Sequence, residues 1–175
     1  MAKKTVNVAL IGTKFMGKAH SNGLRQVVRF FDLPVEPVMK VICGRNPKET
    51  AAAAKQFGWE EASTDWKAVI NRKDIDVVDI SSSGEWHHPM AIAAAKAGKH
   101  IICEKPLANN LKQAEQMTEA VKKAGVSNLC GFSYRFAPAV ATIKKMIQKG
   151  ELGELYHFRA CYQQDWIVDP EFPLN

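Results

Sequence analysis

The 175 residues are 46% hydrophobic and 24% charged, a balance that excludes both an intrinsically disordered chain and a disulfide-stapled miniprotein. No apolar run reaches the roughly 20 residues of a membrane span, and the start MAKKTVNVALIG lacks the apolar segment of a signal peptide, so we expect a cytoplasmic protein without a membrane partner. The net charge of +6 arises within residues 1–131, where 19 Lys and Arg face 13 Asp and Glu without forming a basic helix or stripe. We therefore expect an anionic small ligand and no nucleic acid.

Apolar runs alternate with segments of helical period along the chain. The predicted strands cover residues 6–11, 38–43, 76–81, 100–103 and 126–132, with a short connection near 61–63. The predicted helices cover about 17–31, about 65–71, 138–149, a segment from Pro89 to Gly98, one that begins near Asn110, and one that opens with Asn46 as N-cap, Pro47 at the first position and Glu49 closing a capping box. Continuous Val and Ile runs indicate parallel strands buried on both faces. The expected fold class is α/β, a Rossmann doubly wound parallel sheet.

The segment LYHFRACY at 155–162 differs from the other predicted strands. It places one set of alternate residues on one face (Tyr156, Phe158, Ala160 and Tyr162) and the other set on the opposite face (Leu155, His157, Arg159 and Cys161), which is typical of a sheet with one open face. We interpret residues 1–131 as an NAD(P)-binding Rossmann domain. Residues 132–175 are then the incomplete start of a second, α/β domain with an open, mostly antiparallel sheet.

The first predicted strand leads into IGTKFMGKAH, which partly matches the pattern G-x-G-x-x-G. Gly12 matches the tight-turn glycine and Gly17 the helix-packing glycine, whereas Lys14 replaces the middle one. A strand before the loop and a helix after it are the context in which a helix N-terminus binds a pyrophosphate. Lys14 would then contact a phosphate or, by its bulk, push the dinucleotide away; the alternative is an ordinary turn with a solvated lysine.

The second predicted strand ends at Gly44 and Arg45, where an NAD-binding domain usually places an acid for the ribose 2′-hydroxyl. A guanidinium in place of that carboxylate favours a 2′-phosphate, which Arg binds with two parallel hydrogen bonds. We predict NADP as the preferred cofactor, with NAD as the alternative. Arg45 as an ordinary surface residue is the competing interpretation.

Two further strand ends carry polar residues. The 76–81 strand leads into SSSGEWHH, where small Ser side chains such as Ser82 allow a cofactor close approach to the backbone. His87 and His88 are adjacent, so their rings point to different sides and no metal site is expected. The 100–103 strand leads into Glu104-Lys105-Pro106. Lys105 is either a proton-exchanging residue beside the nicotinamide or half of a structural ion pair with Glu104.

Three segments together give a family resemblance: IGTKFMGKAH, DVVDISSSGEWHHPMAIAAAKAGKHIICEKPLA and GFSYRFAPAVATIKKMIQKGELGELYHFRACY. They resemble the N-terminal part of the Gfo/Idh/MocA oxidoreductases, the family of glucose–fructose oxidoreductase and inositol dehydrogenases. The resemblance covers essentially the whole chain and is most specific in AGKHIICEKPLA. It implies hydride transfer between NAD(P) and a sugar, inositol or related polyol.

The resemblance also implies roles for individual residues. The cofactor-binding residues would be Gly12, Lys14, Phe15, Met16 and Gly17 at the pyrophosphate, Arg45 at the adenosine end, Ser82 and His87 beside the nicotinamide half, and Glu104, Lys105 and Arg135 at the nicotinamide ribose. Lys105 would be the catalytic residue that orients the substrate hydroxyl and relays its proton. Tyr134 and Gln163 are candidates on the substrate side. The family further suggests a cis bond between Lys105 and Pro106.

The chain departs from the family pattern at Lys14, in the SSSG loop, and in lacking the D-x-x-x-H type segment that supplies the catalytic Asp and His. We therefore expect an incomplete chain that binds cofactor without turnover, from a protein that forms homo-oligomers. A non-catalytic NAD(P)-sensing regulator on the same fold is the alternative. A methyltransferase with a sulfonium cofactor is disfavoured by the EKP segment and Arg45.

Overall fold

The structure is a computed structural model that describes residues 3–165, 168–169 and 171. The chain divides into two compact units, one ending at Phe132 and the other beginning at Ser133.

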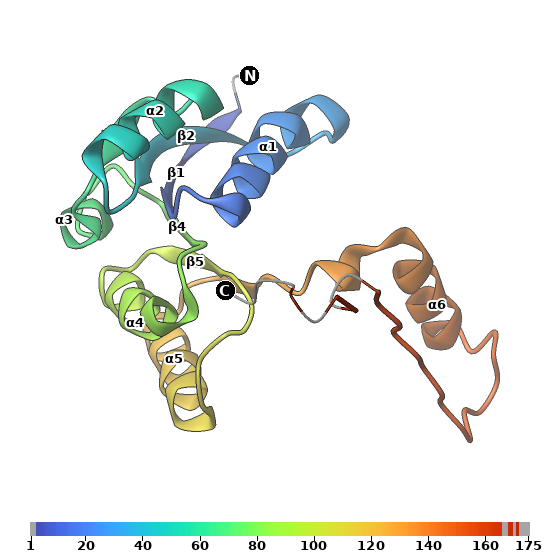
Figure 1. Ribbon diagram of the computed structural model, residues 1–175. Helices are drawn as coiled ribbons and strands as arrows, with labels where there is room; N and C mark the ends of the chain where they lie inside the picture. Colours follow the sequence, from blue (N-terminus) through green and yellow to red (C-terminus); the bar gives the residue numbers. More distant parts are fainter. Residues whose placement is uncertain (1–2, 166–167, 170, 172–175) are drawn as a thin grey trace. The chain divides into compact units, whose positions relative to one another are not determined.

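The first unit contains a six-stranded sheet in which each neighbouring pair is parallel (Figure 1). The strands are β1 (Lys4–Ile11), β2 (Val35–Cys43), β3 (Glu61–Ser63), β4 (Val77–Ile80), β5 (His100–Cys103) and β6 (Asn128–Cys130). Their order across the sheet is β3-β2-β1-β4-β5-β6, so the chain moves outward first to one side of β1 and then to the other. This confirms the predicted Rossmann-like parallel sheet.

The helices of the first unit cover both faces of the sheet. They are α1 (Phe15–Phe30), α2 (Pro47–Phe57), α3 (Trp66–Ile70), α4 (His87–Lys96) and α5 (Leu111–Ala124), with a 3₁₀ turn η1 (Gly84–Trp86) before α4. Successive residues of β1 point to opposite faces. Leu10 packs with the apolar residues of α1 and α2, whereas Ile11 packs with those of α3, α4 and α5. The sheet is therefore buried on both sides, as its apolar runs predict.

Three helices begin at side-chain caps that the sequence contains. Asn46 accepts hydrogen bonds from the backbone N–H groups of Lys48 and Glu49, and Asn110 accepts one from Gln113. Asp65 caps α3 in the same way. The predicted N-cap at Asn46 is confirmed, but the capping box is not closed because the Glu49 carboxylate pairs with Lys14.

Several boundaries differ from the sequence prediction by a few residues, and two of these differences have a clear physical reason. Residues 61–63, predicted as a connection, form the edge strand β3, which pairs with β2. Its sequence, Glu-Ala-Ser, has no apolar run because an edge strand is only partly buried. Helix α4 begins at His87, one residue after the 3₁₀ turn, so Pro89 lies in its first turn where the missing N–H costs nothing.

A polar network joins the chain after α3 to its surroundings. The Arg72 guanidinium binds Glu61 on β3 and Asp74 two residues further on. Lys99 is 9% exposed, and its ammonium donates to the carbonyl oxygens of Arg72, at 2.6 Å, and Ile75, at 2.8 Å. Each buried polar group in this region thus has a partner.

The second unit contains a 3₁₀ turn, η2 (Ser133–Phe136), and the helix α6 (Pro138–Gln148). The prediction of a strand over 155–162 is wrong, because these residues form no regular structure. A strand is held by hydrogen bonds to a neighbour, and residues 133–165 of this unit offer no second strand to pair with. The open, antiparallel sheet predicted for this part of the chain is therefore absent from its described residues.

No helix among the described residues has the length and apolar content that crossing a membrane requires.

Candidate functional site

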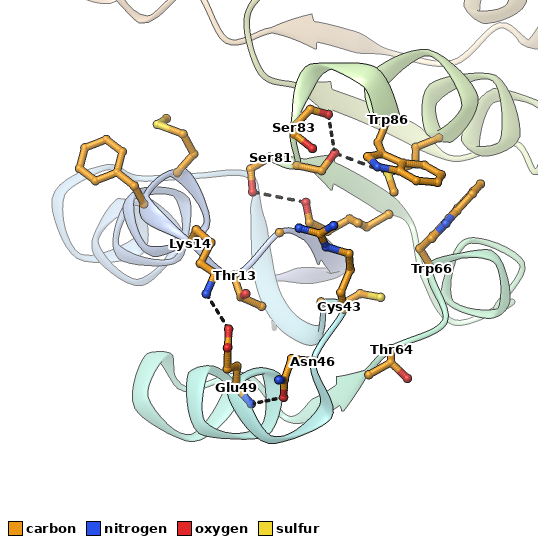
Figure 2. Close-up of a pocket in the computed structure, with 18 residues that line it drawn as sticks. Thr13, Lys14, Cys43, Asn46, Glu49, Thr64, Trp66, Ser81, Ser83 and Trp86 are labelled. Atoms are coloured by element: carbon orange, nitrogen blue, oxygen red, sulfur yellow. Dashed lines mark hydrogen bonds and ion pairs between the residues drawn. The ribbon is translucent and has the colours of Figure 1, made fainter. Parts of the chain in front are cut away.

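A cavity of about 700 Å³ opens at the carboxyl ends of β1, β2 and β4, within the first unit (Figure 2). In doubly wound sheets this edge is where ligands bind. It brings together several residues of the predicted cofactor site, which come from three different loops. The lining residues are Ile11, Gly12, Thr13, Lys14, Phe15, Met16, Cys43, Gly44, Arg45, Asn46, Glu49, Thr64, Trp66, Ser81, Ser82, Ser83, Trp86 and Met90.

The loop after β1 approaches its neighbours so closely that two positions require glycine. Gly12 has a φ of +128°, and a Cβ built on it would lie 2.6 Å from the carbonyl oxygen of Ser81. A Cβ on Gly17 would lie 2.2 Å from the carbonyl oxygen of Gly12. These contacts explain the two glycines that match the fingerprint, and they bring the start of α1 against the end of β1.

Lys14 stands where the fingerprint has its middle glycine. Its ammonium lies 2.6 Å from the Glu49 carboxylate on α2, and Figure 2 shows the two side chains pointing toward one another at the edge of the cavity. The side chains of Lys14 and Glu49 are 82% and 54% exposed, so this pair contributes little to stability. The Lys14 ammonium therefore lies at the cavity, in an ion pair weak enough for a bound anion to replace the Glu49 carboxylate.

The first turn of α1 has no side-chain cap and no acidic residue. Its N–H groups and the positive end of its dipole lie beside the glycine loop. At the start of α2 the equivalent groups are occupied by Asn46. The start of α1 is therefore suited to bind an anion. The donors are backbone N–H groups, and their only signal in the sequence is the pair of glycines on either side of them.

The far side of the cavity has aromatic residues that sequence reasoning missed. Trp66 begins α3 and Trp86 ends η1, and their rings pack edge to face with centroids 6.5 Å apart. Both line the cavity, together with Arg45 from the end of β2. The two tryptophans are 20 residues apart in the sequence and share no motif, so only the folded loops bring them together.

Cys43, at the end of β2, also lines the cavity. Its burial raises the pKa of the thiol to about 11, so Cys43 is a neutral, unreactive thiol at physiological pH.

His87 does not line this cavity. Its ring is 1% exposed and lies between two loops, with Nδ1 2.8 Å from the carbonyl oxygen of Pro106 and Nε2 3.0 Å from that of Ser82. His87 therefore joins the serine loop after β4 to the segment after β5. A role beside the nicotinamide remains a prediction for this residue.

The segment after β5 contains Glu104, Lys105 and Pro106. The peptide bond between Lys105 and Pro106 is cis, which confirms the prediction from the family resemblance. Lys105 is exposed, whereas Glu104 is 6% exposed and accepts the backbone N–H of Lys105 at 3.0 Å. The interpretation of Glu104 and Lys105 as a structural ion pair is wrong, because the Glu104 carboxylate contacts the Lys105 backbone and a histidine.

That histidine is His20, on the first helix. Its Nδ1 lies 2.9 Å from each carboxylate oxygen of Asp79, and its Nε2 lies 3.1 Å from Oε1 of Glu104. The hydrogen bond to Asp79 raises the pKa of His20, and burial raises the pKa of Asp79. Sequence reasoning missed this cluster, although an aspartate inside the apolar strand DVVDIS was a signal that a polar partner exists.

The remaining predicted residues, Tyr134, Arg135 and Gln163, belong to the second unit. There the hydroxyl groups of Tyr134 and Tyr162 are hydrogen-bonded, and their rings pack edge to face with centroids 5.5 Å apart. Their cofactor and substrate roles remain predictions. Among the residues that the structure describes, no three His, Cys, Asp or Glu side chains are arranged to hold a metal ion.

Comparison with known proteins identifies the relatives of this chain. Levoglucosan dehydrogenase of Pseudarthrobacter phenanthrenivorans is 47% identical over 173 residues, which are 98% of this chain and 44% of that protein. The scyllo-inositol 2-dehydrogenase (NAD(+)) of Bacillus subtilis is 32% identical over 169 residues, 95% of this chain and 47% of that protein. The chain thus spans about half the length of these curated relatives or slightly less.

Solved structures give the same result. A levoglucosan dehydrogenase in complex with NADH and levoglucosan superposes with a TM-score of 0.94 at 47% identity, over 97% of this chain and 46% of that one. Residues 6–132 match the profile of the Gfo/Idh/MocA oxidoreductases, described as an oxidoreductase family with an NAD-binding Rossmann fold. The resemblance carried by the glycine loop and the EKP segment is confirmed: this chain belongs to the Gfo/Idh/MocA oxidoreductase family.

Proposed function

We propose that this chain is the dinucleotide-binding part of an oxidoreductase that transfers hydride between NAD(P) and a hydroxyl-bearing carbon of a sugar, inositol or related polyol. The observation that carries the proposal is the cavity at the carboxyl ends of β1, β2 and β4, next to the glycine loop. The relatives named as levoglucosan and inositol dehydrogenases support the substrate class.

The residues around the cavity fit a dinucleotide. Cβ atoms at Gly12 and Gly17 would overlap backbone atoms, so these glycines hold the loop against the serine loop and bring the start of α1 close to the end of β1. The uncapped first turn of α1 offers N–H donors, and the Lys14 ammonium adds a positive charge beside them. Trp66 and Trp86 offer aromatic surface for the adenine.

In this proposal the chain's own residues hold the two halves of the cofactor. The segment from Gly12 to Gly17, with Phe15 and Met16, binds the pyrophosphate. Ser82, Glu104 and Lys105 border the nicotinamide half, and Lys105 also binds the substrate hydroxyl and passes on its proton. When bound, the nicotinamide accepts or donates the hydride. Arg135 at the ribose, and Tyr134 and Gln163 on the substrate side, complete the proposal.

We further propose that NADP is preferred over NAD. Arg45 lines the cavity two residues after the end of β2, and Asn46, the next residue, uses its side chain to cap α2. A guanidinium at this position would bind a 2′-phosphate with charge-assisted hydrogen bonds. The relative crystallised with NADH supports a nicotinamide dinucleotide in general.

Titration of the tryptophan fluorescence with NADPH and with NADH tests both proposals. Binding of either ligand should quench Trp66 and Trp86, and a lower Kd for NADPH supports the 2′-phosphate contact. The variant Arg45→Asp should raise the Kd for NADPH at least about tenfold more than that for NADH, the loss of one charge-assisted hydrogen bond. Equal losses would exclude the 2′-phosphate role, and no binding of either ligand would overturn the proposed function.

We also propose that residues 1–131 form the cofactor domain and that a second domain begins at residue 132. The family match ends at residue 132, which supports this boundary. Because the proposed cofactor contacts other than Arg135 lie in the first part, we expect these 175 residues to bind the dinucleotide without turning over a sugar or inositol. Steady-state dehydrogenase activity at ordinary rates would contradict this expectation.

A further inference from the structure

The His20 cluster, formed by His20, Asp79 and Glu104, is the polar centre of an otherwise apolar region. Asp79 is 2% exposed and Glu104 is 6% exposed. Both nitrogens of the His20 ring lie within 3.1 Å of carboxylate oxygens. Ionised carboxylates only accept hydrogen bonds, so this geometry suits a ring that donates from both nitrogens, the imidazolium form.

Glu104 is held from three directions. Its Oε1 accepts from the His20 ring, and its Oε2 accepts from the backbone N–H of Lys105. On a third side lies Gly131, just after β6, where a Cβ would come within 2.4 Å of Oε1. These contacts fix the position of the Glu104 carboxylate, and through its hydrogen bond the carboxylate constrains the position of the Lys105 backbone.

We propose that His20 is a positioning residue for Lys105: it fixes the Glu104 carboxylate, and through that carboxylate it ties helix α1 to the segment that carries Lys105. The inference rests on the proposed function, in which the glycine loop before α1 binds the pyrophosphate and Lys105 meets the nicotinamide end. In this arrangement the two halves of the cofactor site are joined by the His20 cluster.

The arrangement depends on pH through His20. The groups that face its ring are Asp79 on β4 and Glu104 after β5, and the neighbouring thiols are those of Cys103 and Cys130. Burial raises the pKa of both thiols, that of Cys103 to about 12, so they stay neutral while His20 titrates. The pKa of His20 lies above 6.5, so the two-sided contact is complete at lower pH and is lost as the pH rises through that pKa.

Nuclear magnetic resonance of the wild-type chain tests this geometry without any cofactor. With ¹⁵N-labelled histidine, the His20 ring should carry protons on both nitrogens at pH 6.5. The backbone amide shift of Lys105 should change with the same midpoint as the ring. In His20→Gln that step should disappear, whereas in His88→Gln, a control on α4, it should remain. A neutral His20 ring at pH 6.5, or a Lys105 amide that ignores its titration, overturns the proposal even if His20→Gln does not fold.

A double-mutant cycle on dinucleotide affinity tests the route of action. His20→Gln should raise the Kd for the preferred dinucleotide about tenfold, the effect of one charge-assisted hydrogen bond. Lys105→Met should raise it by a similar factor, and the double variant should bind no more weakly than Lys105→Met alone. Fully additive losses would show that His20 does not act through Lys105. If the wild-type chain binds neither NADH nor NADPH, the proposed function fails, while the magnetic resonance result still decides the geometry.

Discussion

Replacing each of two glycines of α1 by alanine should have opposite effects. Gly17 and Gly23 lie six residues apart in the same helix, yet a Cβ on Gly17 would be 2.2 Å from the Gly12 carbonyl oxygen, whereas one on Gly23 would have nothing within 4 Å. An ordinary carbon–oxygen contact is about 3.3 Å, so Gly17→Ala forces α1 and the glycine loop apart by roughly 1 Å. The neighbour is backbone, which cannot rotate away.

The magnitudes follow from the two terms involved. Alanine is favoured over glycine in a helix by about 0.5 to 1 kcal/mol, and Gly23→Ala should raise the free energy of unfolding by that amount. In Gly17→Ala the same gain is opposed by overpacking of about 1 to 3 kcal/mol. We expect a net loss of stability of up to about 2 kcal/mol there, and the two variants differ by the overpacking contribution alone, about 1 to 3 kcal/mol.

Urea unfolding followed by circular dichroism measures both free energies. Each kcal/mol corresponds to about 2 to 4 °C in the melting temperature of a chain this size. Dinucleotide affinity provides the second readout, because a displaced glycine loop weakens the pyrophosphate contact in Gly17→Ala and leaves it intact in Gly23→Ala. If the two variants were equally stable and bound NADPH and NADH equally well, the close approach between α1 and the loop would be refuted.

Two other predictions concern the polar network after α3. Lys99→Met leaves two buried carbonyl oxygens without their donor and should cost about 1 to 3 kcal/mol of unfolding free energy, whereas Lys96→Met on the exposed side of α4 should change it little; equal effects would contradict the buried contact. Hydrogen bonds from Arg72 lower the pKa of Asp74 to about 2 and also lower that of Glu61. The two carboxylates therefore contribute to the free energy of unfolding above about pH 4, and this contribution is lost as the pH falls toward 2. The melting temperature of Arg72→Gln should consequently fall less steeply than that of the wild type over this range. Parallel curves would exclude the ion-pair contribution.

The sheet was predictable because its signals are local. Short apolar runs of two to four residues identify β1, β2, β4 and β5, and the caps at Asn46 and Asn110 identify two helix starts. The glycine loop was predictable for the same reason, since strand, glycine and helix follow one another within a dozen residues.

The errors occur where structure depends on distant residues. His20 meets Asp79 and Glu104 across 59 and 84 positions, and no local pattern connects them. The alternation over 155–162 satisfies the local rule for a strand, but a strand needs a partner, and the described part of its unit provides none. An alternating sequence pattern is therefore not sufficient to form a strand.

The uncapped start of α1 has a consequence for how ligand and fold depend on each other. A dinucleotide bound as we propose would occupy the N–H groups that no side chain of this helix occupies, and so would serve as its cap. Because a ligand that binds only the folded chain stabilises it by RT ln(1 + [L]/Kd), the concentration of free cofactor would influence how much of this chain is folded. Slower amide hydrogen exchange in the first turn of α1 on adding cofactor would make that linkage visible residue by residue.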